Sequence, residues 1–222
     1  PLRRRTDPSA TRLAQGGAVL WGGLGISPDR PGLEAAMATH MAVQIPLLIA
    51  AGVLIAPALR NYEPAWLAEV NRWGIPGILL AIFTHLFWML PRSLDTALAD
   101  PWVELAKFVT LPLLAGLPLG LSWPRLPTLG RGFVWVMLTS MLGAIGAIYL
   151  TAPTRLCAYY RFDQQAAAGW TLIDIAIALV LLLFVAAFTG LPWPWPAVRR
   201  HDGGQSAGRR AISPRSPDAD RR

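Results

Sequence analysis

The stretch Met41–Leu59, MAVQIPLLIAAGVLIAPAL, contains nineteen residues and no charged side chain. A helix rises about 1.5 Å per residue, so about 20 apolar residues cross the roughly 30 Å hydrocarbon core of a bilayer. Two further stretches of similar length, Gly74–Leu90 and Phe133–Ala152, are also free of charge apart from His85. The chain is therefore predicted to be an integral membrane protein.

Two more stretches bring the predicted number of spans to about five. Val103–Trp123 and Trp170–Trp193 carry polar residues only near their first turns. The composition agrees, because 54% of the residues are hydrophobic and only 15% are charged, against about 25% in a soluble domain. Since lipid offers no partner to backbone N–H and C=O groups, we predict an all-α, polytopic transmembrane helix bundle.

The charge pattern divides the chain into three predicted regions. Residues 1–34 are expected to form an extramembrane or interfacial segment, residues 35–195 the transmembrane domain, and residues 196–222 a disordered basic tail. The net charge of +7 comes from arginines at span ends and in the tails, which argues for membrane orientation and against nucleic-acid binding. By the positive-inside rule, the C-terminal tail is predicted to be cytoplasmic.

Polar residues gather at the outer ends of the predicted spans. His40 and Gln44 lie four residues apart and share one helix face, as do His85 and Met89. Imidazole and thioether groups are the ligands that suit Cu(I). The candidate metal ligands are therefore His40, Met41, His85 and Met89. The residues expected to orient the helices or to hydrogen-bond around this site are Gln44, Glu104, Lys107, Arg155, Tyr159, Tyr160, Asp163, Gln164, Gln165 and Asp174.

Several of these residues also have a simpler structural interpretation. His85 could hydrogen-bond a carbonyl of a neighbouring helix, and the methionines could be packing residues. Met137 and Met141 are expected to lie in the core of their span. Glu104 and Lys107 lie three residues apart, a spacing that favours an ion pair between them.

Asp174 lies within the last predicted span and is expected to face a polar partner, for which Arg155 or Lys107 is the candidate. The single cysteine, Cys157, excludes an intrachain disulfide. The chain has no Walker loop, no dinucleotide glycine fingerprint, no His-Glu-x-x-His and no Gly-x-Ser-x-Gly motif. It is therefore expected not to be an enzyme.

Three pieces of sequence resemble one known family. APTRLCAYY at 152–160, followed by Asp163-Gln-Gln165 and Gly169-Trp170, resembles a loop and the helix start after it in the CtaG-type cytochrome c oxidase assembly proteins. His40-Met41 and Trp88-Met-Leu-Pro91 resemble two further family motifs. Gln44, Met89 and Lys107 or a neighbour of Lys107 stand where the family pattern has histidine.

The resemblance implies a non-enzymatic assembly factor for a haem–copper oxidase in a bacterial inner membrane. Its partners would be the lipid bilayer and oxidase subunits, its cofactor copper, and it would not bind nucleic acid. An alternative is a structural accessory subunit without metal. A third possibility, a small-molecule or ion carrier, ranks last because the span after Asp174 shows no polar stripe.

Overall fold

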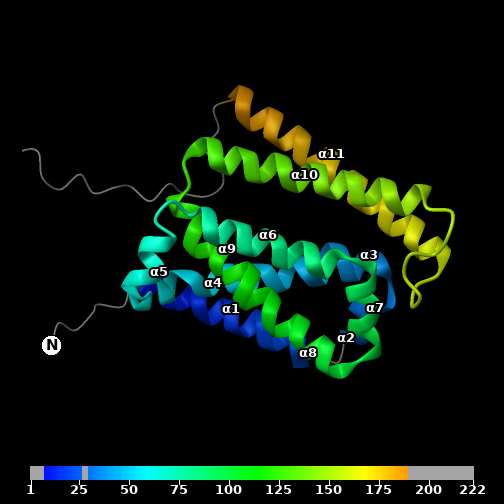
Figure 1. Cartoon of the computed structure of the whole chain (residues 1–222), viewed down its shortest axis with the longest axis horizontal. Helices are drawn as coiled ribbons and strands as arrows, with labels where there is room; N and C mark the ends of the chain where they lie inside the picture. Colours follow the sequence, from blue (N-terminus) through cyan, green and yellow to red (C-terminus); the bar gives the residue numbers. More distant parts are fainter. Residues whose placement is uncertain (1–7, 27–29, 190–222) are drawn as a thin grey trace, which may run out of the picture.

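The computed structural model describes residues 8–26 and 30–189, and within them helices joined by short loops account for the fold, without a strand (Figure 1). The predicted tail, 196–222, lies outside the described residues. Four helical segments are long and apolar enough to cross a membrane: Met37–Tyr62, Pro101–Arg125, Thr128–Thr151 and Phe162–Thr189. The polytopic α-helical fold predicted from the sequence is confirmed.

The span predicted over Gly74–Leu90 belongs to a bent pair of helices. Helix α6 (Ile75–Met89) is followed directly by α7 (Pro91–Ala99), and the two are inclined by 69° to each other. Pro91 starts the new helix, because its fixed φ angle suits the first helical turn and its missing N–H is not needed there. Four spans become five if this bent pair counts as one.

Two of the long segments contain a widened turn. In the first segment, α3 (Met37–Thr39) leads through the π-helical turn η1 (His40–Gln44) into α4 (Ile45–Leu59) and η2 (Arg60–Tyr62). The segment Pro101–Arg125 has the same construction, with α8 (Pro101–Thr110), the π-helical turn η3 (Leu111–Gly116), α9 (Leu117–Ser122) and η4 (Trp123–Arg125).

A proline explains each widened turn. Ile45 donates its N–H to the carbonyl oxygen of His40, five residues back, and Pro46 follows; Leu117 bonds Pro112 in the same way, and Pro118 follows. Proline lacks the donor for the carbonyl four residues earlier and its ring crowds that carbonyl, so the preceding turn opens.

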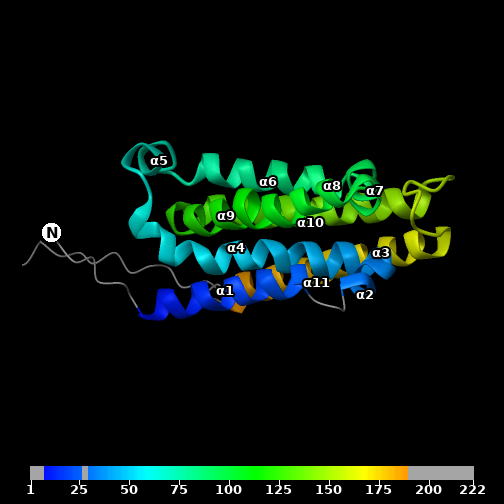
Figure 2. The ribbon, with the colours of Figure 1, turned by 90° about the horizontal axis from the view of Figure 1, so that it is seen from below.

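The remaining helices surround these spans. Helix α1 (Pro8–Ile26) runs beside α4 (Figures 1 and 2), and the indole Nε1 of Trp21 donates to the carbonyl oxygen of Phe108 at 2.8 Å. The short helices α2 (Arg30–Ala35) and α5 (Ala65–Val70) lie at opposite ends of the molecule. Helices α10 (Thr128–Thr151) and α11 (Phe162–Thr189) form a hairpin.

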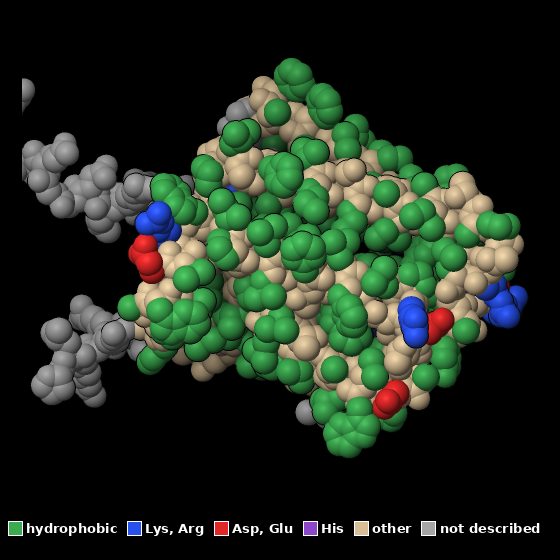
Figure 3. All heavy atoms as spheres, in the orientation of Figure 1, with side chains coloured by type: hydrophobic (Ala, Val, Ile, Leu, Met, Phe, Trp, Pro, Cys, Tyr) green, Lys and Arg blue, Asp and Glu red, His purple; other side chains and the backbone are tan. Residues whose placement is uncertain are grey.

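Charged side chains lie toward the two ends of the molecule, as Figure 3 shows for one face, and hydrophobic side chains cover the middle. At the α5 end, Arg125 forms an ion pair with Glu63. At the other end, α7 and the loop 152–161 meet, because the Asp95 carboxylate accepts the backbone N–H of Ala158 at 2.7 Å. This second end is the one predicted to face outward, and it holds most of the candidate residues.

Candidate functional site

A buried ammonium group lies at the end of the molecule where α7 meets the loop 152–161. The side chain of Lys107, on α8, is 0% exposed. Its Nζ lies 3.1 Å from Oε1 of Glu34, 3.0 Å from Nε2 of His40 and 3.4 Å from Oε1 of Gln44. A carboxylate, an imidazole and an amide, drawn from α2 and η1, thus surround one cation. The predicted shared face of His40 and Gln44 is confirmed, because both reach the same atom.

The hydroxyl of Tyr160 fixes the tautomer of His40. That hydroxyl donates to the backbone oxygen of Glu34 at 2.9 Å, so its oxygen accepts from Nδ1–H of His40 at 2.8 Å. Nε2 is then the unprotonated nitrogen, and it accepts a hydrogen bond from Lys107. His40 is neutral, and both of its ring nitrogens have protein partners.

Glu34 supplies the negative charge of this cluster. Burial alone would raise the pKa of the Glu34 carboxyl group, but the hydrogen bond from Gln44 and the ammonium of Lys107 together hold that pKa below its ordinary value. The Nε2 amide of Gln44 donates to Oε1 of Glu34 at 2.8 Å. A buried charge without its partner is destabilising, so Lys107 and Glu34 depend on each other.

Glu34 was missed by the sequence interpretation, which expected Lys107 to pair with Glu104. Lys107 forms an ion pair with Glu34, 73 positions away along the chain. The pairing of Lys107 with Glu104 stays a prediction. The available signal was weak: Glu34 is an acidic residue shortly before the first span. We refer to Glu34, His40, Gln44, Lys107 and Tyr160 as the lysine cluster.

Two glutamines tie the loop 152–161 to the helices. Gln165 accepts the backbone N–H of Leu156 at 2.8 Å and donates to the backbone oxygen of Tyr149 at 3.1 Å. Gln164 donates to the backbone oxygen of Ala35 at 3.1 Å. These residues were predicted to orient the helices. Asp95, which anchors the same loop, was not singled out from the sequence.

Other predicted residues lie away from the cluster. Tyr159 is 57% exposed, and Arg161 pairs with Asp163 on the surface. Arg155 and Asp174 are exposed, and Asp174 lies on α11 rather than beside Lys107. The expected pairing of Asp174 with Arg155 or Lys107 is not among the ion pairs that the structure shows for the described residues.

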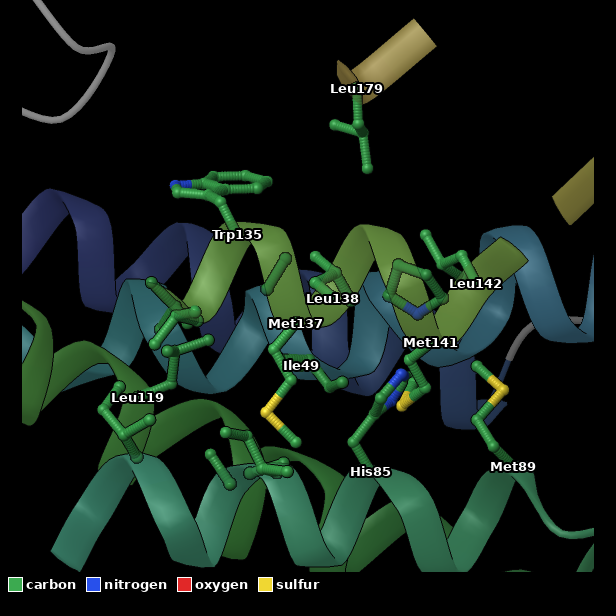
Figure 4. Close-up of a pocket in the computed structure, with 18 of the residues that line it drawn as sticks. Ile49, His85, Met89, Leu119, Trp135, Met137, Leu138, Met141, Leu142 and Leu179 are labelled. Atoms are coloured by element: carbon green, nitrogen blue, oxygen red, sulfur yellow. The ribbon is translucent and has the colours of Figure 1, made fainter. Parts of the chain in front are cut away.

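A cavity of about 610 Å³ lies beneath the lysine cluster, between the α10–α11 hairpin and helices α4, α6 and α9. Its lining is almost entirely apolar. The exceptions that could bind a ligand through a lone pair are one imidazole and four of the five methionines: His85, Met41, Met89, Met137 and Met141. Figure 4 shows His85 and Met141 pointing toward each other across this space.

The imidazole of His85 has an unused nitrogen. Its Nδ1 atom is buried and, among the described residues, has no hydrogen-bond partner. The carbonyl contact considered from the sequence is therefore not made by this nitrogen. A buried polar atom without a partner costs about 1–3 kcal/mol, so this nitrogen is a candidate ligand atom.

The structure divides the four predicted metal ligands between two places. Met41, His85 and Met89 line the cavity, whereas His40 belongs to the lysine cluster and is not among the residues of the lining. Met137 and Met141, expected in the core, face the same cavity. No group of three His, Cys, Asp or Glu side chains suited to a metal occurs in the described part of the chain, so a site here would rely on thioethers.

Comparisons with family models, with curated proteins and with solved structures find no match to this chain. The likeness to CtaG-type proteins accordingly stays a prediction.

Proposed function

We propose that this membrane protein binds Cu(I) in the cavity between α6 and the α10–α11 hairpin and serves the assembly of a haem–copper cytochrome c oxidase. The observation that carries the proposal is that His85, whose buried Nδ1 has no hydrogen-bond partner among the described residues, lines a cavity together with four thioethers. Imidazole with thioether is a soft ligand set that selects Cu(I) over harder cations. The oxidase as the destination rests on the sequence resemblance.

The ligand set suits temporary storage of the ion. His85 and the thioethers are neutral groups, so a bound Cu(I) keeps its positive charge and is held without a charge-neutralising thiolate or carboxylate. Methionine side chains are flexible and can follow an ion as it enters or leaves. A carrier that must release its metal needs this kind of exchangeable binding.

The lysine cluster supports the site from outside. Met41 directly follows His40, and Met41 is 1% exposed and lines the cavity. The hydrogen bonds that Tyr160 and Lys107 make with His40 hold the η1 turn in place, and with it the Met41 side chain. His40 would therefore act as a positioning residue and not as a metal ligand.

Copper competition tests this proposal. Purified full-length protein in detergent is titrated with Cu(I) held by a chromophoric chelator, and the copper taken from the chelator is read from its absorbance. We expect tight binding by the natural chain and at least about tenfold weaker binding by His85→Leu or Met141→Leu. Met37→Leu is the matched control, because Met37 is fully buried but outside the cavity lining. Equal affinity in His85→Leu and Met37→Leu would overturn the proposed site.

A second candidate function is a structural accessory subunit. The observation that favours it is the lysine cluster, in which a buried cation joins α2, η1 and α8. This alternative predicts that oxidase maturation survives His85→Leu and is lost in Lys107→Met. Copper handling predicts that both changes impair maturation.

A further inference from the structure

Asp174 lies on an unpartnered face of α11. The residue is exposed, and its neighbours on the same face are large and apolar: Trp170 is 60% exposed, Ile177 53% and Leu181 60%. In the most apolar stretch of α11, only 11% of the residues are buried, the lowest share among the four candidate spans. We call Trp170, Asp174, Ile177 and Leu181 the Asp174 face.

The packing of α10 against α11 gives the depth of Asp174. Gln165 bonds the backbone of Tyr149, and Gly146 approaches Gly169 so closely that a Cβ on Gly146 would lie 2.8 Å from the Gly169 carbonyl oxygen. Asp174 lies five residues beyond Gly169, roughly 7.5 Å further along the helix. That position is level with the middle of Thr128–Thr151, the predicted span beside it.

A carboxylate at this depth is costly when it faces lipid. Ionisable residues inside a bilayer cost about 2.5–3.5 kcal/mol on insertion scales and almost always pair with another group or face a polar cavity. Asp174 does not line the cavity. Within the described residues it makes no hydrogen bond or ion pair. None of the described residues therefore neutralises this carboxylate.

We infer that the Asp174 face binds a transmembrane helix of another protein that presents Lys or Arg near the middle of the bilayer. The charge of Asp174 selects this partner, since a basic side chain at the same depth would neutralise it. A second copy meeting this face by two-fold symmetry would place two carboxylates together, which is unfavourable. The inference does not depend on copper, because the face lies outside the cavity lining.

The test uses full-length protein in vesicles with three single-span peptides of leucine and alanine. One peptide has Arg at its centre, one Leu and one Glu. The protein carries a donor fluorophore on an N-terminal tag and each peptide an acceptor. We expect energy transfer to show that the Arg peptide binds at least roughly threefold tighter than the Leu peptide, the size of one interhelical polar contact.

The preference for Arg should disappear in Asp174→Leu and persist in Asp174→Glu. Asp163→Asn is the matched control, because Asp163 is an exposed acid on the same helix that already pairs with Arg161. Equal binding of the Arg and Leu peptides by the natural chain would overturn the inference. So would tighter binding of the Glu peptide, or self-association of the chain that Asp174→Leu abolishes, which would identify a second copy as the occupant.

Discussion

Nζ of Lys107 lies 3.0 Å from Nε2 of His40. An ammonium group therefore occupies the position from which a metal ion would bind this imidazole. Because Lys107 also bonds Glu34, a metal at His40 would have to displace a buried ion pair. The first span thus uses its histidine for helix packing and leaves metal binding, as proposed, to the cavity below.

Removing the buried cation should destabilise the protein. Lys107→Met leaves the Glu34 carboxylate without its counter-ion, and we expect a loss of about 3–5 kcal/mol in the free energy of unfolding. Adding Glu34→Gln should recover part of that loss, since no charge is then stranded. Denaturant unfolding in mixed micelles measures both. Arg72→Met, which breaks the exposed pair of Arg72 with Glu69, is the control and should change stability by less than about 1 kcal/mol.

The hydroxyl of Tyr160 should contribute to stability and to the tautomer of His40. Tyr160→Phe leaves Nδ1–H of His40 and a backbone oxygen of Glu34 without this partner, at a cost of about 1–3 kcal/mol. Tyr159→Phe, which changes an exposed tyrosine, should alter the free energy of unfolding by less than about 0.5 kcal/mol. Nitrogen NMR of labelled histidine should show the Nδ1–H form of His40 in the natural protein. An Nε2–H form would contradict the assignment.

Stability should fall in acid through Glu34. The pKa of the Glu34 carboxyl group in the folded protein is below its ordinary value of 4.5. This group therefore stabilises the fold above that value, and its contribution is lost as the pH falls through the lower, folded-state pKa. Thermal unfolding at a series of pH values between about 7 and 3 measures the effect. Glu34→Gln should be less stable at neutral pH and show a flatter profile. An identical acid slope in both proteins would contradict this role.

Cys157 should be nearly inert toward thiol reagents. The side chain is 1% exposed, and burial, aided by the Asp95 carboxylate, raises the pKa of its thiol to about 12. Little thiolate exists at neutral pH, so maleimide labelling should be slow. Asp95→Ala removes the acceptor of the Ala158 N–H, frees the loop and should speed labelling about tenfold or more. Asp163→Asn should leave the rate unchanged, and fast labelling of the natural chain would contradict the burial.

The sequence predicted those features that depend on one helix at a time. Uncharged runs such as Met41–Leu59 gave the spans because bilayer thickness sets their length. Helical spacing correctly placed Gln44 beside His40 and Met89 beside His85, as the lysine cluster and the cavity lining show.

Contacts between distant helices could not be predicted in this way. Glu34 reaches Lys107 across 73 positions, and spacing along one helix does not say which helix lies opposite. Met137 and Met141 look like ordinary core residues from their own span, and only the placement of the α10–α11 hairpin turns them toward the cavity.

The widened turn at His40–Gln44 sets the angular register of the first span. On the C-terminal side of this turn, the close approach of Gly52 to Gly116 fixes α4. Within the turn, the side chains of His40 and Gln44 must reach Lys107. One residue corresponds to about 100° of rotation about a helix axis. Deleting a single residue from this turn would rotate the imidazole of His40 away from the ammonium of Lys107 and leave the contact of Gly52 with Gly116 intact. The extra residue of the widened turn is what allows the first span to make both contacts.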